Sequence, residues 1–184
     1  MSVLTVANQL TLLRVMLIPA FVILVIYGHL GWAAVVFAAA CLTDALDGLT
    51  ARWSDQKSTL GAWLDPMADK LLALSTFIVL TVPWLGLANP LPIWLTVLII
   101  SRDVVIVGTV AIVNLAIGPR TFRPSFLGKV ATATYMMTAV VAMFYNYLGY
   151  HSLVVDAFIY ASLAITLISS MHYIYHAARI IEGR

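Results

Sequence analysis

The chain has 184 residues, of which 62% are hydrophobic and only 10% are charged, and its mean hydropathy is +1.00. A soluble domain of this length cannot hide so many apolar side chains from water, so the composition excludes a soluble globular protein and favours a polytopic membrane protein. The single cysteine, Cys41, excludes an intrachain disulfide, and we expect no nucleic-acid partner. The N-terminal stretch has no positive charge before Arg14, so no cleavable signal peptide is predicted.

Long apolar runs separated by turn sequences predict the secondary structure. About 20 residues of helix cross the hydrocarbon core of a bilayer, and the alternation typical of strands is absent. The turn sequences are rich in Gly, Pro and Asn, as in YGHLGW and NYLGYH. We therefore predict an all-α integral membrane protein with six transmembrane helices, near residues 9–27, 32–53, 61–83, 92–116, 127–147 and 152–178.

The basic residues predict the orientation of these helices. If both termini lie on one side, all ten Lys and Arg residues fall at or toward that side, and the loops on the opposite side carry none. By the positive-inside rule, we expect that side to be the cytoplasm. We also expect residues 1–184 to form a single membrane domain. Its last four residues, IEGR (181–184), also match a protease-site remnant of an expression tag.

Four aspartates stand on the two sides of a short predicted loop, within TDALDGLTARWSDQKSTLGAWLDPMADK (43–70). Asp44 and Asp47 are three residues apart on the helix before the loop, and Asp65 and Asp69 are four residues apart on the helix after it. Both spacings place the two carboxylates on one helical face. A hairpin of the two helices brings these faces together near the cytoplasmic surface.

Four neighbouring carboxylates need compensating positive charge. Their repulsion at low dielectric exceeds what Arg52 and Lys70 alone can offset. Carboxylate oxygens without His or Cys favour Mg²⁺ or Mn²⁺ over zinc. Such ions keep open positions for substrate phosphates, and two of them about 4 Å apart can hold a phosphoryl group during in-line displacement. Gly48 and Gly61 allow a flat group to approach the backbone closely. The sequence therefore predicts a site for two divalent ions that binds phosphates.

The spacing D-x2-D-G-x2-A-R-x8-G-x3-D-x3-D resembles the signature of the CDP-alcohol phosphotransferase family. Each fixed position is filled, by Asp44, Asp47, Gly48, Ala51, Arg52, Gly61, Asp65 and Asp69. So many fixed positions at set spacing make a highly specific match. NQLTLLR (8–14) is also similar to the family's N-terminal PNxLTLxR stretch, although Ala7 stands where proline is common.

The resemblance implies a six-helix homodimer with its site facing the cytoplasm. Such an enzyme transfers a phosphatidyl group from CDP-diacylglycerol to an alcohol and releases CMP. Residue by residue, it implies metal ligands at Asp44, Asp47, Asp65 and Asp69. Asp69 would also be the catalytic base that deprotonates the acceptor hydroxyl. The CDP pocket would be formed by Asp47, Gly48, Ala51, Arg52 and Gly61.

The C-terminal half bears on the identity of the acceptor. IISRDVVIVG (99–108) and RPSFLGKVATATYM (123–136) resemble the branch of the family that makes phosphatidylglycerol phosphate or cardiolipin. Glycerol-phosphate enzymes of this branch usually have RE and GKxKT here, whereas this chain has Arg102–Asp103, and Ala131 in place of the second lysine. Loss of that cation matters less for phosphatidylglycerol, a monoanionic diester, than for glycerol 3-phosphate. These departures favour phosphatidylglycerol, as in eukaryotic-type cardiolipin synthases, with glycerol 3-phosphate as the alternative.

Other interpretations of the charged residues stay open. We expect the acceptor to contact the basic residues Arg102, Arg120, Arg123 and Lys129, of which Arg102 is the strongest candidate because a buried charge needs a partner. Alternatively, Arg102 and Asp103 form a salt bridge that only positions the helix, and the loop cations contact anionic lipid. A more distant alternative is a cation transporter, which would scatter its acidic residues over several helices rather than two.

Overall fold

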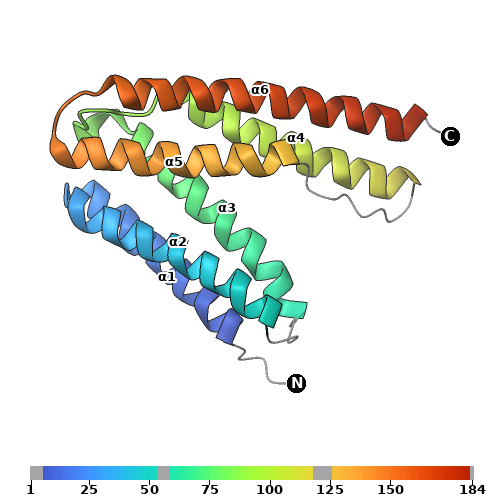
Figure 1. Cartoon of the computed structure of the whole chain (residues 1–184), viewed down its shortest axis with the longest axis horizontal. Helices are drawn as coiled ribbons and strands as arrows, with labels where there is room; N and C mark the ends of the chain where they lie inside the picture. Colours follow the sequence, from blue (N-terminus) through green and yellow to red (C-terminus); the bar gives the residue numbers. More distant parts are fainter. Residues whose placement is uncertain (1–5, 54–58, 118–125, 183–184) are drawn as a thin grey trace. The chain divides into compact units, whose positions relative to one another are not determined.

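The computed structural model in Figure 1 describes the backbone of residues 6–53, 59–117 and 126–182, and the side chains of residues 9–43, 67–109, 115, 126–173 and 175. Its elements are α1 (Val6–Ile26), α2 (Leu30–Trp53), α3 (Thr59–Thr81), the 3-10 turn η1 (Pro83–Leu85), α4 (Ile93–Ile117), α5 (Phe126–Leu148) and α6 (Leu153–Glu182). No strand occurs in the described ranges. The six predicted helices are confirmed, with ends that differ by only a few residues.

Local turn chemistry explains where the helices stop. Gly28 ends α1 with a φ of 75°, a left-handed conformation that is strained for residues with a Cβ atom. The amide of Gly28 donates to the carbonyl of Val25 at 3.0 Å, and that of His29 donates to Leu24 at 2.8 Å. These two bonds form a Schellman motif, which satisfies carbonyls that the helix end would otherwise leave open. Gly28, the first glycine in YGHLGW, therefore ends the helix where the turn sequence predicts it.

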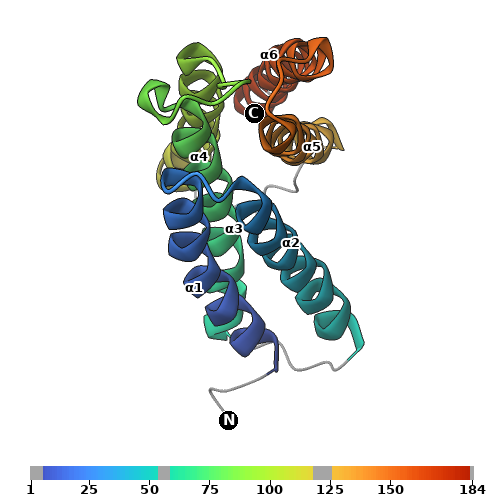
Figure 2. The ribbon, with the colours of Figure 1, turned by 90° about the vertical axis from the view of Figure 1, so that its left-hand side faces the viewer.

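The chain divides into two compact units, residues 1–90 with 143–151, and residues 91–142 with 152–184. In the first unit, α1 packs against both α2 and α3 (Figure 2). The rings of Phe21 and Phe37, both buried, lie 5.6 Å apart at this contact. Ala33 and Ala40 are buried on the same face of α2 as Phe37. Such small residues let membrane helices approach one another closely.

In the second unit, α4 contacts α6, and hydroxyl groups tie α5 to α6. Tyr135 shares a hydrogen bond of 2.6 Å with Thr166, and Thr138 shares one of 2.7 Å with Ser162. All four residues are buried. Water is absent from the bilayer core, so polar groups there must find partners within the protein, and these pairs do so between two helices.

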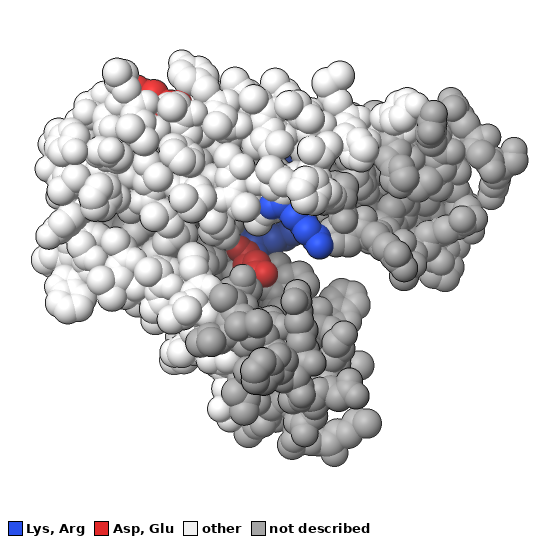
Figure 3. All heavy atoms as spheres, viewed as in Figure 1, with Lys and Arg blue, Asp and Glu red and all other residues white. Residues whose placement is uncertain are grey.

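Several described helices are suited to a membrane. Three have an apolar stretch long enough to cross one, at Gln9–Ile26, Phe126–Leu148 and Leu153–Tyr173, and Leu30–Thr43 is a shorter apolar helix. On the face that Figure 3 shows, most of the described surface is uncharged, apart from a small group of charged side chains near its centre. The predicted all-helical architecture is confirmed within the described ranges, and three of its helices are long and apolar enough to cross a membrane. That all six helices span the bilayer, that both termini are cytoplasmic and that the chain dimerises stay predictions.

Two buried asparagines connect the loop after α3 to the end of α5 within the first unit. The backbone amide of Asn89 donates to Oδ1 of Asn146 at 2.6 Å, and Nδ2 of Asn146 donates to the carbonyl of Asn89 at 3.1 Å. Nδ2 of Asn89 also donates to the backbone carbonyl of Tyr150 at 2.9 Å. These bonds satisfy backbone groups that no helix pairs.

We predict that Asn146→Ala lowers the free energy of unfolding by about 1–3 kcal/mol, because it removes both partners of the buried Asn89 backbone groups. Thermal unfolding of the detergent-solubilised protein measures the change. Tyr150→Phe is the control, since Asn89 binds the backbone and not the hydroxyl of Tyr150. Equal melting temperatures for Asn146→Ala and the wild type would contradict the prediction.

Candidate active site

The aspartate motif lies on two helices that contact each other. The backbone is helical at all four positions, with Asp44 and Asp47 in α2 and Asp65 and Asp69 in α3. Their spacings of three and four residues therefore place each pair on one helical face. Of these four residues, only Asp69 has a described side chain. The remaining motif positions, Gly48, Ala51, Arg52 and Gly61, are likewise described only as helical backbone.

The described side chain of Asp69 forms an ion pair that sequence reasoning missed. Nη1 of Arg14, on α1, donates to Oδ1 of Asp69. The Arg14 side chain is 0% exposed, whereas that of Asp69 is 44% exposed. Sequence reasoning considered only Arg52 and Lys70 as nearby cations and predicted divalent ions as the main compensating charge. Arg14 could have been suspected, because it is the only Lys or Arg in the first 51 residues and stands within an apolar run.

The Asp69 side chain is paired with arginine at one carboxylate oxygen and is partly exposed as a whole. Oδ1 faces Arg14 on α1, and the neighbouring Ala68 is buried in the helix contact. The large exposed fraction of Asp69 shows that the group is not enclosed by the helices. Asp69 is therefore a partly exposed carboxylate that is paired with a buried arginine.

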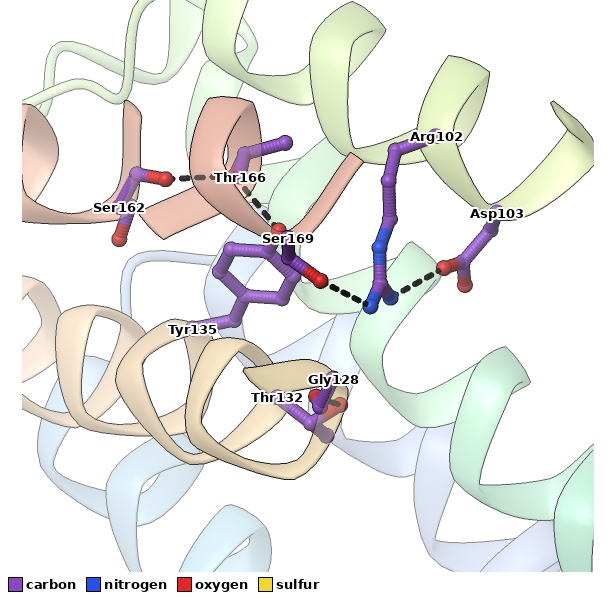
Figure 4. A network of polar contacts seen from close by, with 8 residues as sticks. All are labelled: Arg102, Asp103, Gly128, Thr132, Tyr135, Ser162, Thr166 and Ser169. Atoms are coloured by element: carbon purple, nitrogen blue, oxygen red, sulfur yellow. Dashed lines mark hydrogen bonds and ion pairs between the residues drawn. The ribbon is translucent and has the colours of Figure 1, made fainter. Parts of the chain in front are cut away.

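Arg102 lies in the middle of α4 and points away from it toward α6 (Figure 4). Its side chain is only 10% exposed. Nη1 donates to Oδ1 of the adjacent Asp103 at 2.9 Å, and Nη2 donates to Oγ of Ser169 at 3.2 Å. The salt bridge between Arg102 and Asp103, which was the alternative interpretation of these two residues, is therefore present. Nε of Arg102 is buried and has no hydrogen-bond partner among the described residues.

The other predicted acceptor contacts are only partly described. Lys129 lies in the first turn of α5 and is exposed. Arg120 and Arg123 lie outside the described residues. Sequence reasoning missed Ser169, which is buried on α6 and reaches Arg102 from 67 residues away. A serine among apolar residues gives no local signal of such a partner.

No group of three or more His, Cys, Asp or Glu side chains that could hold a metal occurs among the described side chains. Three of the four motif aspartates lie outside that set, so the predicted metal ligands stay a prediction. Their chemistry suits the predicted ions. Carboxylates spaced on two contacting helices supply the hard oxygen donors that Mg²⁺ and Mn²⁺ prefer.

Comparison with known proteins identifies the class to which this helical membrane chain belongs. The family model described as CDP-alcohol phosphatidyltransferase matches residues 4–168, which include the whole aspartate motif and Arg14. The chain therefore belongs to the CDP-alcohol phosphatidyltransferase family, and the resemblance seen in its motif is confirmed.

Individual relatives carry two different names. Cardiolipin synthase (CMP-forming) of Rattus norvegicus is 33% identical over 200 residues, covering 98% of this chain and 65% of the rat protein. The human protein of the same name is also 33% identical, covering 95% of this chain and 62% of its own length. A "probable phosphatidylglycerophosphate synthase" of Mycobacterium tuberculosis (strain ATCC 25618 / H37Rv) is 34% identical, covering 96% of this chain and 83% of the relative. The chain thus spans slightly less than two thirds of the two mammalian relatives.

Proposed function

We propose that the protein makes phospholipid by transferring a phosphatidyl group from CDP-diacylglycerol to an alcohol, with release of CMP. The observation that carries the proposal is the complete aspartate motif on two contacting helices, in a chain that belongs to the CDP-alcohol phosphatidyltransferase family. The rat and human relatives are named as CMP-forming enzymes, which agrees with CMP as the leaving group.

The donor is bound by the motif residues in this proposal. Asp44, Asp47, Asp65 and Asp69 hold two Mg²⁺ or Mn²⁺ ions, which neutralise the diphosphate of CDP-diacylglycerol when they are bound. Asp47, Gly48, Ala51, Arg52 and Gly61 form the CDP pocket. The two glycines leave room for the nucleotide beside the helices, and Arg52 pairs with a phosphate or with a motif carboxylate.

Asp69 is the catalytic base. Its accessible carboxylate accepts the proton of the acceptor hydroxyl, and the oxygen of that hydroxyl attacks the phosphorus of the phosphatidyl group. The bond between this phosphorus and the oxygen of CMP then breaks, and CMP leaves with the electron pair. General-base catalysis of this kind typically contributes about 10²–10⁴-fold to the rate. The partial exposure of Asp69 supports its role, because a base must be reachable by the acceptor.

Phosphatidylglycerol is the proposed acceptor, and cardiolipin is then the product. The names of the rat and human relatives favour it. Ala131 is 0% exposed on α5, so the position where glycerol-phosphate enzymes of the family carry a second lysine faces the protein interior. Alanine in place of that second lysine therefore removes a cation from the interior of the protein and not from its surface. Glycerol 3-phosphate is the second candidate, which the name of the Mycobacterium tuberculosis relative favours.

Arg102 is the first candidate for contact with the acceptor phosphate, together with Arg120, Arg123 and Lys129. The buried Nε of Arg102 supports this role, because a buried N–H group without a partner is costly and a phosphate oxygen would satisfy it. Asp103 and Ser169 occupy other donors of the same guanidinium and orient it. We also propose that all six helices span the membrane, that the site faces the cytoplasm and that the enzyme is a homodimer.

The direct test is an assay of the purified protein with CDP-diacylglycerol and Mg²⁺, in which CMP and lipid product are both measured. We expect CMP and cardiolipin with phosphatidylglycerol as acceptor, and no activity in excess EDTA, because the motif carboxylates without bound ions repel the diphosphate instead of binding it. If the only lipid product is phosphatidylglycerol phosphate, formed from glycerol 3-phosphate, then glycerol 3-phosphate and not phosphatidylglycerol is the acceptor. Turnover that persists in EDTA would refute the metal site.

We predict that Asp69→Asn lowers kcat at least about 100-fold, because the amide cannot accept the hydroxyl proton. Binding of CDP-diacylglycerol should remain detectable by titration calorimetry. Asp156→Asn is the matched control, since it makes the same change in the first turn of α6 at a residue with no proposed role. Substantial turnover in Asp69→Asn would rule out this residue as the base.

We predict that Ala131→Lys raises the ratio of activity with glycerol 3-phosphate to activity with phosphatidylglycerol. The new cation would face the interior, where it can compensate a dianionic phosphate monoester. Thr132→Lys is the matched control, because it adds the same charge at the next residue of α5, which is exposed. An unchanged ratio in folded Ala131→Lys would show that this position does not decide the acceptor.

A further inference from the structure

We propose that Arg14 is a positioning residue for the base, and that it sets the direction of the Asp69 carboxylate toward the acceptor hydroxyl. The inference rests on the proposed function, in which Asp69 takes the hydroxyl proton. Nη1 of Arg14 holds Oδ1 of Asp69, while the aspartate side chain as a whole stays partly exposed and within reach of an acceptor.

The position of Arg14 on α1 is unusual for a charged residue. Thr11, Arg14, Ile18 and Phe21 are all buried, and their spacing of three or four residues makes them one face of the helix. This face packs in the first unit, where α1 contacts α2 and α3. Arg14 therefore occupies a core position at which an apolar side chain would normally stand, and its guanidinium is directed by the packing around it.

Asp69 stands at the edge of the buried face of α3. Ala68 and Leu72 are buried, whereas the Asp69 side chain is 44% exposed. An aspartate at such an edge can rotate about its side-chain bonds, and only some of its rotamers suit proton transfer. A contact from a rigid, buried arginine restricts that rotation. Misplacement of a reacting group by about 1 Å can cost as much as 10²-fold in rate.

A purely stabilising role explains this pair less well. Buried ion pairs contribute little net stability compared with apolar side chains of similar volume, because removing the charges from water is costly. Here the costly burial falls almost wholly on Arg14, while its partner stays accessible. The arrangement therefore suits a role in orienting a catalytic carboxylate better than a role in stabilising the helix packing.

The experiment compares Arg14→Gln, Arg14→Lys and wild type in the CMP-release assay with CDP-diacylglycerol, phosphatidylglycerol and Mg²⁺. We expect Arg14→Gln to lower kcat about 10–100-fold, with KM for CDP-diacylglycerol and the Mg²⁺ concentration for half-maximal activity within about twofold of wild type. Arg14→Lys should recover most of the lost kcat, because it keeps a cation beside Asp69. Lys70→Gln is the control, since it removes the exposed cation next to Asp69 in the sequence.

Each outcome separates this role from the alternatives. A wild-type kcat in folded Arg14→Gln would overturn the inference, and so would an unchanged kcat with a raised KM or Mg²⁺ requirement, which would assign Arg14 to the donor or the metal. If Arg14→Gln does not fold, Arg14→Lys tests the inference instead. A folded Arg14→Lys variant with a kcat as low as that of Asp69→Asn would overturn the positioning role of Arg14. An inactive wild type would instead refute the proposed function on which the inference rests.

Discussion

A charge surrounded by apolar side chains is stable only when a partner compensates it, and this constraint explains the contacts of two buried arginines. Arg14 is wholly buried on α1 and pairs with Asp69 on α3. Arg102 is almost as deeply buried on α4 and pairs with Asp103 and Ser169. In both cases the arginine supplies the buried end of the contact, while the carboxylate retains some exposure. Such carboxylates remain reachable, which is what chemistry on a substrate requires.

Buried neutral polar groups also need partners, and their hydrogen bonds stabilise the fold. Asn89 and Asn146 satisfy each other through backbone and side-chain atoms within the first unit. Tyr135 and Thr138 find hydroxyl partners on α6 within the second unit. Because water cannot satisfy hydroxyl groups inside a bilayer, the pairs between α5 and α6 favour one arrangement of these two helices. A chain so rich in interchangeable apolar residues depends on such pairs for a unique packing.

The proposed chemistry makes opposite demands on neighbouring residues of α3. Ala68 and Leu72 must be buried for the helix to pack, whereas Asp69 must stay accessible to an acceptor. The helical repeat meets both demands, since adjacent residues point about 100° apart and a single turn can present a packed face and an open edge. In our proposal the ion pair with Arg14 fixes the direction of the Asp69 side chain, as packing fixes the positions of Ala68 and Leu72.

The sequence by itself determined the features that depend on local pattern. Apolar runs and glycine turns predicted all six helices, because helix formation and termination depend on residues a few positions apart. The motif spacing was sufficient to identify the family, since its eight positions span only 26 residues from Asp44 to Asp69. Tertiary structure alone decided which partners the two buried arginines contact. Arg14 and Asp69 are 55 residues apart, and Arg102 and Ser169 are 67 apart. No local periodicity encodes such pairs, because they arise only when the packing of whole helices brings their faces together.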